Sequence, residues 1–153
     1  MQEIGRAAAE LFHDTDLIDV SIMMVITMDD HIAPIAAKLS VVAEMDGRIA
    51  GVAMGEMHDD NAYLRKRDVD PVLQQRGAGA ALVNAFANGA TWLDASAIFL
   101  STFRIPPSRA PFYREQGFRD IASSDYLPWM QAIEREPAML LDIEKRVFLM
   151  PGV

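Results

Sequence analysis

Cysteine is absent from the 153 residues of this chain. Its absence excludes disulfide bonds, thiolate metal sites and a cysteine nucleophile. The three histidines, His13, His31 and His58, do not stand at the spacing of metal ligands, so we expect no bound metal.

Basic residues are scarce relative to acidic ones. The chain has 14 Lys and Arg against 22 Asp and Glu, which gives a net charge of −8. A surface of this sign argues against nonspecific binding to nucleic acid, because phosphates attract basic patches. It mildly favours a cationic partner, such as an amine.

Long hydrophobic runs are missing too. No stretch approaches the roughly 20 apolar residues that a membrane span needs, so we expect no membrane partner. The first residues are neither basic enough nor followed by an apolar region as in a secretory signal. A length of 153 residues, with 51% hydrophobic and 24% charged, is typical of one globular domain over residues 1–153. We expect this domain to be cytoplasmic.

The stretch from Val69 to Leu82 organises the rest of the chain. It is typical of a strand end, a tight turn with glycines, and the first turn of a helix over about 75–94. Pro71 ends a strand ladder because it has no N–H to donate, and Gly77 and Gly79 allow close approach of the backbone. Free N–H groups and the positive end of a helix dipole suit a phosphate group.

Two common phosphate-binding loops do not match this stretch. A Walker loop requires Gly-Lys-Ser/Thr, but Ala78 follows Gly77. The dinucleotide fingerprint requires a third glycine, and Leu82 stands there. The remaining pattern resembles the acyl-CoA-binding motif of the GNAT acyltransferase superfamily: Val69-x-Pro71-x-x-Gln74-x-x-Gly77-x-Gly79.

A second segment, from Arg109 to Phe118, resembles the other GNAT signature, in which an aromatic-Tyr pair precedes x-x-x-Gly-Phe. Together with the segment Leu100–Arg104 it is similar to one bacterial GNAT branch. That branch usually carries Trp-Asn where Ser108 and Arg109 stand. The first family strand is also missing, unless residues 20–28 supply something in its place.

The resemblance implies an α/β (α+β) fold with a mixed, mostly antiparallel central sheet and helices on both faces. The residue pattern predicts the elements themselves. We expect a hairpin turn at Asp46-Gly47, the strongest short hairpin signal, and a bulge that shifts the phase of the third strand. The expected strands span residues 39–45, 48–57, 63–70, 97–103, 118–122 and 146–150. The expected helices span residues 2–12, a short segment after Asp29-Asp30, and residues 75–94, 109–116 and 126–136.

The resemblance further implies acetyl transfer from acetyl-CoA, used as a cosubstrate, to a small-molecule or peptide amine. Backbone N–H groups from Gln75 to Ala80 would bind the pyrophosphate, and main-chain groups near Val69 would hold the pantetheine arm and thioester oxygen. Arg76 is either a phosphate partner or a solvated charge at the helix end. The expected cofactor-binding residues are Val69, Gln74, Gln75, Arg76, Gly77, Ala78, Gly79, Ala80, Arg109 and Tyr113.

Tyr113 is the candidate catalytic acid, because a phenol can hydrogen-bond the thiolate that leaves. The alternative is a core aromatic packed beside Phe112 and Phe118. Glu56 is the candidate base, with His58 and Asp68 as other protein groups, and a water chain or an already neutral amine would also serve.

A CoA-binding sensor or interaction module without catalysis stays open as a second function. The resemblance also favours a homodimer, in which an edge strand near the C-terminus pairs across a two-fold axis.

Overall fold

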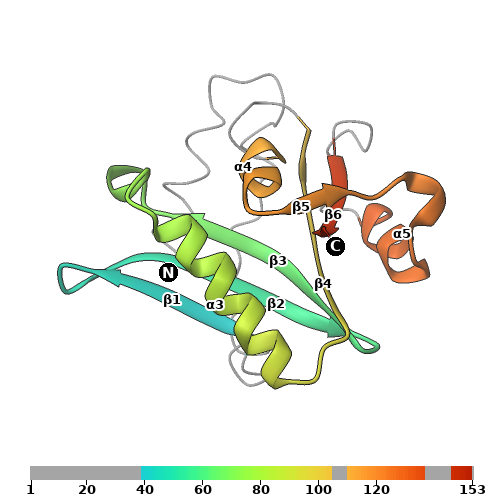
Figure 1. Cartoon of the computed structure of the whole chain (residues 1–153), viewed down its shortest axis with the longest axis horizontal. Helices are drawn as coiled ribbons and strands as arrows, with labels where there is room; N and C mark the ends of the chain where they lie inside the picture. Colours follow the sequence, from blue (N-terminus) through green and yellow to red (C-terminus); the bar gives the residue numbers. More distant parts are fainter. Residues whose placement is uncertain (1–38, 105–109, 137–145, 153) are drawn as a thin grey trace.

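The computed structural model describes residues 39–104, 110–136 and 146–152 (Figure 1). The expected helices over 2–12 and after Asp29-Asp30, the segment 20–28, and residues Ser108 and Arg109 lie outside these ranges. The described strands form one six-stranded sheet in the order β1-β2-β3-β4-β6-β5. The β3–β4 pair is parallel, and the other neighbouring pairs are antiparallel. The strands are β1 (Ser40–Met45), β2 (Arg48–His58), β3 (Asn61–Val69), β4 (Ala97–Phe103), β5 (Phe118–Asp120) and β6 (Arg146–Pro151).

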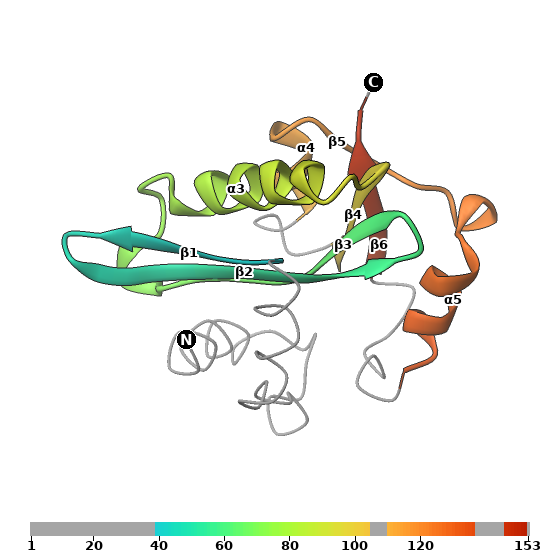
Figure 2. The same cartoon turned by 90° about the horizontal axis from the view of Figure 1, so that it is seen from below.

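Helices cover both faces of the sheet, as expected. Figure 2 shows α3 (Ala78–Trp92) and α4 (Ala110–Glu115) on one face and α5 (Pro128–Glu134) on the other. We call these the α3 face and the α5 face. Two short 3-10 turns, η2 (Pro71–Leu73) and η3 (Ser123–Asp125), complete the described elements. The mixed, mostly antiparallel α/β fold is confirmed.

The β1–β2 hairpin turns at the predicted dipeptide. Asp46 has φ 52° and Gly47 has φ 72°. Two successive positive φ angles are the mark of the type I′ turn, whose twist matches that of the flanking strands. Gly117, with φ 87°, ends α4 in the same left-handed conformation and leads directly into β5.

A β-bulge interrupts the pairing of β2 with β3. Met54 pairs with Lys66, but the next residue, Gly55, pairs with Leu64. Arg65 is therefore the extra residue on β3. A bulge reverses the alternation of side chains beyond it, so the predicted phase shift is confirmed and lies at Arg65.

A hydrophobic core fills the space between α3 and the sheet. Leu82, Phe86 and Ala90 of the predicted helical stripe are each at most 1% exposed, whereas Leu93 is partly buried at the end. Gly55 makes room for this packing, since a Cβ there would collide with the Phe86 ring. Burying a side chain such as Phe86 contributes about 1.5–3 kcal/mol to folding. A second cluster, around Tyr63, Phe99 and Phe148, lies on the α5 face.

Candidate functional site

Strands β3 and β4 pair over only four residues and then diverge. Their register runs from Asn61 with Ala97 to Leu64 with Leu100. Beyond that point β3 continues to Val69 and β4 to Phe103 without a common register. Figure 1 shows the two strands opening into a V, with α4 lying over its open end. The β3 edge from Arg65 to Val69 therefore faces the gap instead of a neighbouring strand. This edge contains the main-chain groups near Val69 that the sequence resemblance predicted to bind the pantetheine arm.

The turn that follows β3 is built by local hydrogen bonds and by two left-handed residues. The Asp70 carboxylate accepts a 2.9 Å hydrogen bond from the N–H of Val72 and so begins η2. Gln75 has φ 62° and Gly77 has φ 85°, on either side of Arg76. Left-handed residues in such turns direct successive N–H groups into a concave nest, which suits an anion.

Helix α3 begins at Ala78, three residues later than the start expected near Gln75. The difference arises because the left-handed residues at 75 and 77 cannot belong to a right-handed helix. Gly77 caps α3 without a side-chain hydrogen bond, and the first backbone bond runs from the N–H of Ala81 to its carbonyl, at 3.0 Å. Within the described ranges, the N–H groups of Ala78, Gly79 and Ala80 have no acceptor. These three donors at the start of α3 are therefore the candidate anion cradle.

Arg67 of β3 places its guanidinium directly over this helix start. A Cβ at position 79 would collide with Nη1 of Arg67 in this position, so any residue other than glycine would require the arginine to shift. The guanidinium carbon lies 4.2 Å from the centre of the Phe112 ring and 5.2 Å from that of Tyr113. Nε of Arg67 is buried without a hydrogen-bond partner, and no carboxylate in the described part of the chain pairs with this arginine.

An unpaired cation at the positive end of a helix is electrostatically unfavourable unless an anion joins it. All three features lie at the start of α3: the Arg67 guanidinium against Gly79, the free N–H groups, and the left-handed residues Gln75 and Gly77. This arrangement makes them a candidate site for a strongly charged anion. The pattern had suggested the N–H groups but not Arg67, because the face that Arg67 occupies depends on the bulge at Arg65.

Three other predicted cofactor residues are Arg76, Gln74 and Arg109. Arg76 is about half exposed and lies 3.6 Å from the carboxylate of Asp46 in the β1–β2 turn. A contact of this kind at the surface contributes little to stability and leaves the arginine able to move to a stronger anion. Gln74 ends η2 and lies in the turn before the cradle. Arg109 lies outside the described residues.

Tyr113 lies on α4, beside the cradle, with 5% of its surface exposed. Its ring makes edge contacts with Phe112, at 5.1 Å between centres, and with Phe118, at 6.0 Å. The hydroxyl has no hydrogen-bond partner within the described ranges. The ring is therefore part of the core, as the alternative interpretation held, and it also contacts the arginine that covers the cradle.

An ion pair fixes α4 to β5. Arg114 donates two hydrogen bonds to the Asp120 carboxylate, at 2.9 and 2.7 Å. This bidentate geometry is the stronger form of a surface ion pair. The hydrogen bond from Arg114 lowers the pKa of Asp120, with nearby Arg104 adding to the same effect. The pair links the helix that carries Tyr113 to β5.

On the α5 face of the V, the polar side chains form a hydrogen-bonded group of two hydroxyls and one guanidinium. The Tyr63 hydroxyl lies 2.8 Å from the Ser101 hydroxyl, and Arg146 donates a 2.9 Å hydrogen bond to the same Ser101 oxygen. Burial raises the pKa of the Tyr63 phenol, although the Ser101 hydrogen bond and Arg146 act in the opposite direction. The sequence pattern did not predict this group, because three separate strands bring it together.

Glu56, the predicted base, lies next to this group on β2, directly across from Tyr63 in the strand register. Its Oε1 accepts from Nε2 of His58 at 2.9 Å and from Arg65 at 3.1 Å. The His58 ring stacks on Trp129 of α5, with 4.6 Å between centres. The structure thus brings Glu56 and His58 together. Asp68 is separate and pairs with Lys66 at 3.0 Å.

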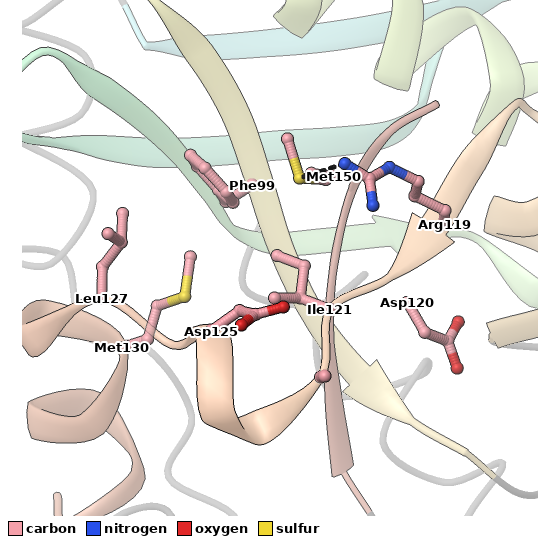
Figure 3. Close-up of a pocket in the computed structure, with 9 residues that line it drawn as sticks. Phe99, Arg119, Asp120, Ile121, Asp125, Leu127, Met130 and Met150 are labelled. Carbon is pink, nitrogen blue, oxygen red and sulfur yellow. Dashed lines mark hydrogen bonds between the residues drawn. The ribbon is translucent and has the colours of Figure 1, made fainter. Parts of the chain in front are cut away.

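A cavity of about 390 Å³ lies elsewhere, between β5, η3 and α5 (Figure 3). Arg119, Asp120 and Asp125 supply its charged groups, among apolar side chains that include Phe99 and Met130. None of the predicted site residues lines it.

Two further properties concern the described residues only. They contain no group of three or more His, Cys, Asp or Glu side chains arranged to hold a metal ion. Their helices include none that is long and apolar enough to cross a membrane.

Comparison with known proteins places the chain among acetyltransferases. Residues 23–133 match the family model of the acetyltransferase (GNAT) domain. A search of curated proteins gave no match.

Solved structures share the fold at low identity. The PaiA N-acetyltransferase of Thermoplasma acidophilum, in complex with coenzyme A, is 11% identical, with a TM-score of 0.74 over 99% of this chain and 90% of that one. A ribosomal-protein-alanine N-acetyltransferase of Brucella melitensis is 14% identical, with a TM-score of 0.67 over 99% and 91%. The N-acetylglutamate synthase of Neisseria gonorrhoeae, complexed with coenzyme A and N-acetyl-glutamate, is 16% identical, with a TM-score of 0.72 over 99% of this chain but 32% of that one.

Proposed function

The chain belongs to the GNAT acetyltransferase family, and on that premise we propose that it moves an acetyl group from acetyl-CoA to a primary amine by direct transfer. The observation that carries the proposal is the unpaired Arg67 guanidinium over the free N–H groups of Ala78, Gly79 and Ala80. A pyrophosphate would satisfy the helix start and the arginine together. Two structural neighbours are complexes with coenzyme A, which supports the same ligand.

The V between β3 and β4 would hold the pantetheine arm. The β3 edge from Arg65 to Val69 offers main-chain groups without a strand partner on that side, and these can hydrogen-bond amide and thioester oxygens. Because Arg67 now fills the space over Gly79, its side chain must move aside when the cofactor enters. Its new position would place the charge beside the phosphates.

The chemistry needs an amine nucleophile, a polarised carbonyl and a proton for the departing thiolate. The amine nitrogen bonds to the thioester carbon, the carbon–sulfur bond breaks, and the Tyr113 hydroxyl donates its proton or a hydrogen bond to the sulfur. A tyrosine has a pKa of about 10 and a thiol about 8.5, so proton transfer is uphill by only a couple of kcal/mol. Glu56 accepts the proton of the ammonium group, directly or through water, before the attack. The second proton that the nitrogen loses after the attack returns to the Tyr113 phenolate, or to the thiolate where Tyr113 only hydrogen-bonds, so the products are a neutral amide and the CoA thiol.

A CoA-binding module without catalysis is the second candidate. The observation that favours it is that Oε1 of Glu56 already accepts from both His58 and Arg65, which leaves fewer lone pairs for a substrate proton. We also propose a homodimer, in which β5, an edge strand of the described sheet, pairs across a two-fold axis. Light scattering that shows a monomer would reject the dimer.

The test of the enzyme is release of free CoA thiol from acetyl-CoA over a broad panel of amines, with the Tyr113→Phe variant alongside. Amine-dependent release that falls in Tyr113→Phe supports the transferase. Binding of CoA without turnover of any amine favours the module instead.

A further inference from the structure

A guanidinium and two hydroxyls meet at the closed end of the V, on the α5 face. Ser101 is the first residue of β4 beyond its last pair with β3, Leu64 with Leu100. Its hydroxyl joins Tyr63, at 2.8 Å, and Arg146, at 2.9 Å. The three side chains come from β3, β4 and β6 and lie on the same face of the sheet.

Arg146 is one of the described arginines that lack an acidic partner. Arg65, Arg104 and Arg114 each lie within 4 Å of a carboxylate. Arg146 has none among the described residues: it bonds to the hydroxyl and, at 3.5 Å, to the carbonyl of Ser101. Its guanidinium also lies 4.9 Å from the centre of the Phe103 ring.

Burial makes this lack of a partner costly. Desolvation lowers the pKa of the Arg146 guanidinium, with little to offset it except the Tyr63 phenol. A partly buried cation of this kind is stabilised when an anion reaches it. Two of its nitrogens, Nε and Nη1, have no hydrogen-bond partner in the described part of the chain, so they can receive an anion.

The position of Arg146 relates this anion site to the reaction. If acetyl-CoA lies in the V as proposed above, its thioester reaches the closed end, beside Arg65 and Ser101. The cradle and α4 occupy the α3 face, so the acceptor approaches from the α5 face. Arg146, which bonds to Ser101, and Glu56, opposite Tyr63 in the strand register, both belong to that face.

We propose that the acceptor is a small amino acid or related amine that carries a carboxylate, and that Arg146 binds this carboxylate. Glu56, which is opposite Tyr63 in the strand register and already accepts from Arg65, is an acidic group of this face that the ammonium end would approach. One guanidinium with hydroxyl neighbours matches the single charge of a carboxylate. This inference rests on the proposed transferase function and specifies its substrate class.

Matched acceptors give the direct test. Each of the 20 amino acids is compared with its carboxamide, and glycine, alanine and lysine also with methylamine, ethylamine and cadaverine, in the CoA-release assay with the full chain. At least one amino acid is expected to exceed its neutral counterpart in kcat/KM by roughly 10- to 100-fold, the value of a hydrogen-bonded charge. Equal or better use of the neutral amines overturns the proposal, and preference for a phosphorylated amine such as phosphoethanolamine overturns it in favour of a phosphate ligand.

Variants of Arg146 test whether this residue causes the preference for a carboxylate. Arg146→Gln should raise KM for the amino acid about 10-fold or more and leave KM for acetyl-CoA unchanged, whereas kcat/KM for the neutral amine should fall much less. Arg146→Lys should recover part of the loss, because it restores the charge. Arg119→Gln, which removes an exposed arginine of β5, is the matched control and should behave as the wild type.

A binding measurement keeps this inference separate from the transferase proposal. Isothermal titration with the N-acetyl amino acids and their amides, in the presence of CoA, needs no turnover. Binding of an acid but not of its amide, lost in Arg146→Gln, supports the carboxylate site even if no amine is acetylated. If CoA binds and amines are acetylated but no acid binds better than its amide, the transferase stands and the carboxylate site is rejected.

Discussion

The guanidinium of Arg67 lies 4.2 Å from the centre of the Phe112 ring, in front of the first turn of α3. This contact joins the strand that opens the V to the helix that covers it. A cation–π contact contributes about 0.5–2 kcal/mol, which a phosphate can exceed. We therefore expect the arginine to exchange the ring for the pyrophosphate when acetyl-CoA binds.

Replacing Arg67 tests this exchange. Arg67→Gln should raise the Kd for CoA by roughly 10-fold or more, because a charge-assisted hydrogen bond contributes about 1.5–3 kcal/mol. Titration calorimetry measures the change, and the Kd of the wild type should rise more steeply with salt than that of the variant. If Arg67 only blocks the groove, Arg67→Gln will bind CoA more tightly than the wild type, which would reject its role in binding.

Gly77 is expected to be required for its backbone conformation and not for space. It has φ 85°, and a Cβ there would meet nothing within 4 Å. Gly77→Ala should lower the free energy of unfolding by about 1–2 kcal/mol, since a left-handed conformation costs an alanine that much. Gly77→Asn should lose less, because asparagine tolerates this region better. Denaturant unfolding measures both, and equal stability of all three proteins would contradict the assigned conformation.

Tyr113→Phe separates the chemical and structural roles of the tyrosine. The ring contacts with Phe112 and Phe118 are kept, so stability and KM for acetyl-CoA should change little. The kcat should fall at least 10-fold, toward the roughly 100-fold or larger contributions of general acids. Unchanged kcat in steady-state assays would assign Tyr113 to the core alone.

Glu56→Gln tests the base through its pH dependence. At neutral pH the variant should acetylate an alkyl amine more slowly, because the ammonium form has a pKa of about 10.4 and must lose a proton. The deficit should narrow as the pH rises toward 9, where more of the amine is neutral. A deficit that stays constant with pH would instead indicate that Glu56 positions the acceptor or its neighbours His58 and Arg65.

The Arg114–Asp120 pair predicts an acid-sensitive contribution to stability. The pKa of Asp120 is lowered in the folded state by the hydrogen bond from Arg114. The stabilisation is therefore present above the ordinary aspartate pKa, about 3.9, and is lost as the pH falls through the lowered value. For this partly exposed pair it should be at most about 1 kcal/mol.

Urea unfolding of the wild type and of Asp120→Asn at pH 7 and pH 3 measures the contribution of this ion pair to the free energy of unfolding. The difference in unfolding free energy should shrink at pH 3, and a difference that grows instead would contradict the sign.

The sequence predicted those features that depend on near neighbours. Asp46-Gly47 specifies its turn because few other dipeptides accept two positive φ angles, and the stripe of Leu82, Phe86 and Ala90 specifies the buried face of α3. The sequence predicted the start of α3 three residues too early, because no residue pattern indicates that Gln75 has a left-handed conformation.

The unpredicted parts of the site depend on pairing between distant strands. The face of Arg67 follows from the bulge at Arg65, which lies opposite Met54 and Gly55 of the distant strand β2. The group of Tyr63, Ser101 and Arg146 forms because β6 inserts between β4 and β5. Such contacts span 38 and 45 residues and leave no local pattern.

Titration of the full chain with acetyl-CoA and with CoA tests the central claim most directly. We predict one site per chain for both ligands, weakened by salt and by Arg67→Gln but not by Arg119→Gln. No binding of either ligand at millimolar concentration would contradict the assignment of the cradle.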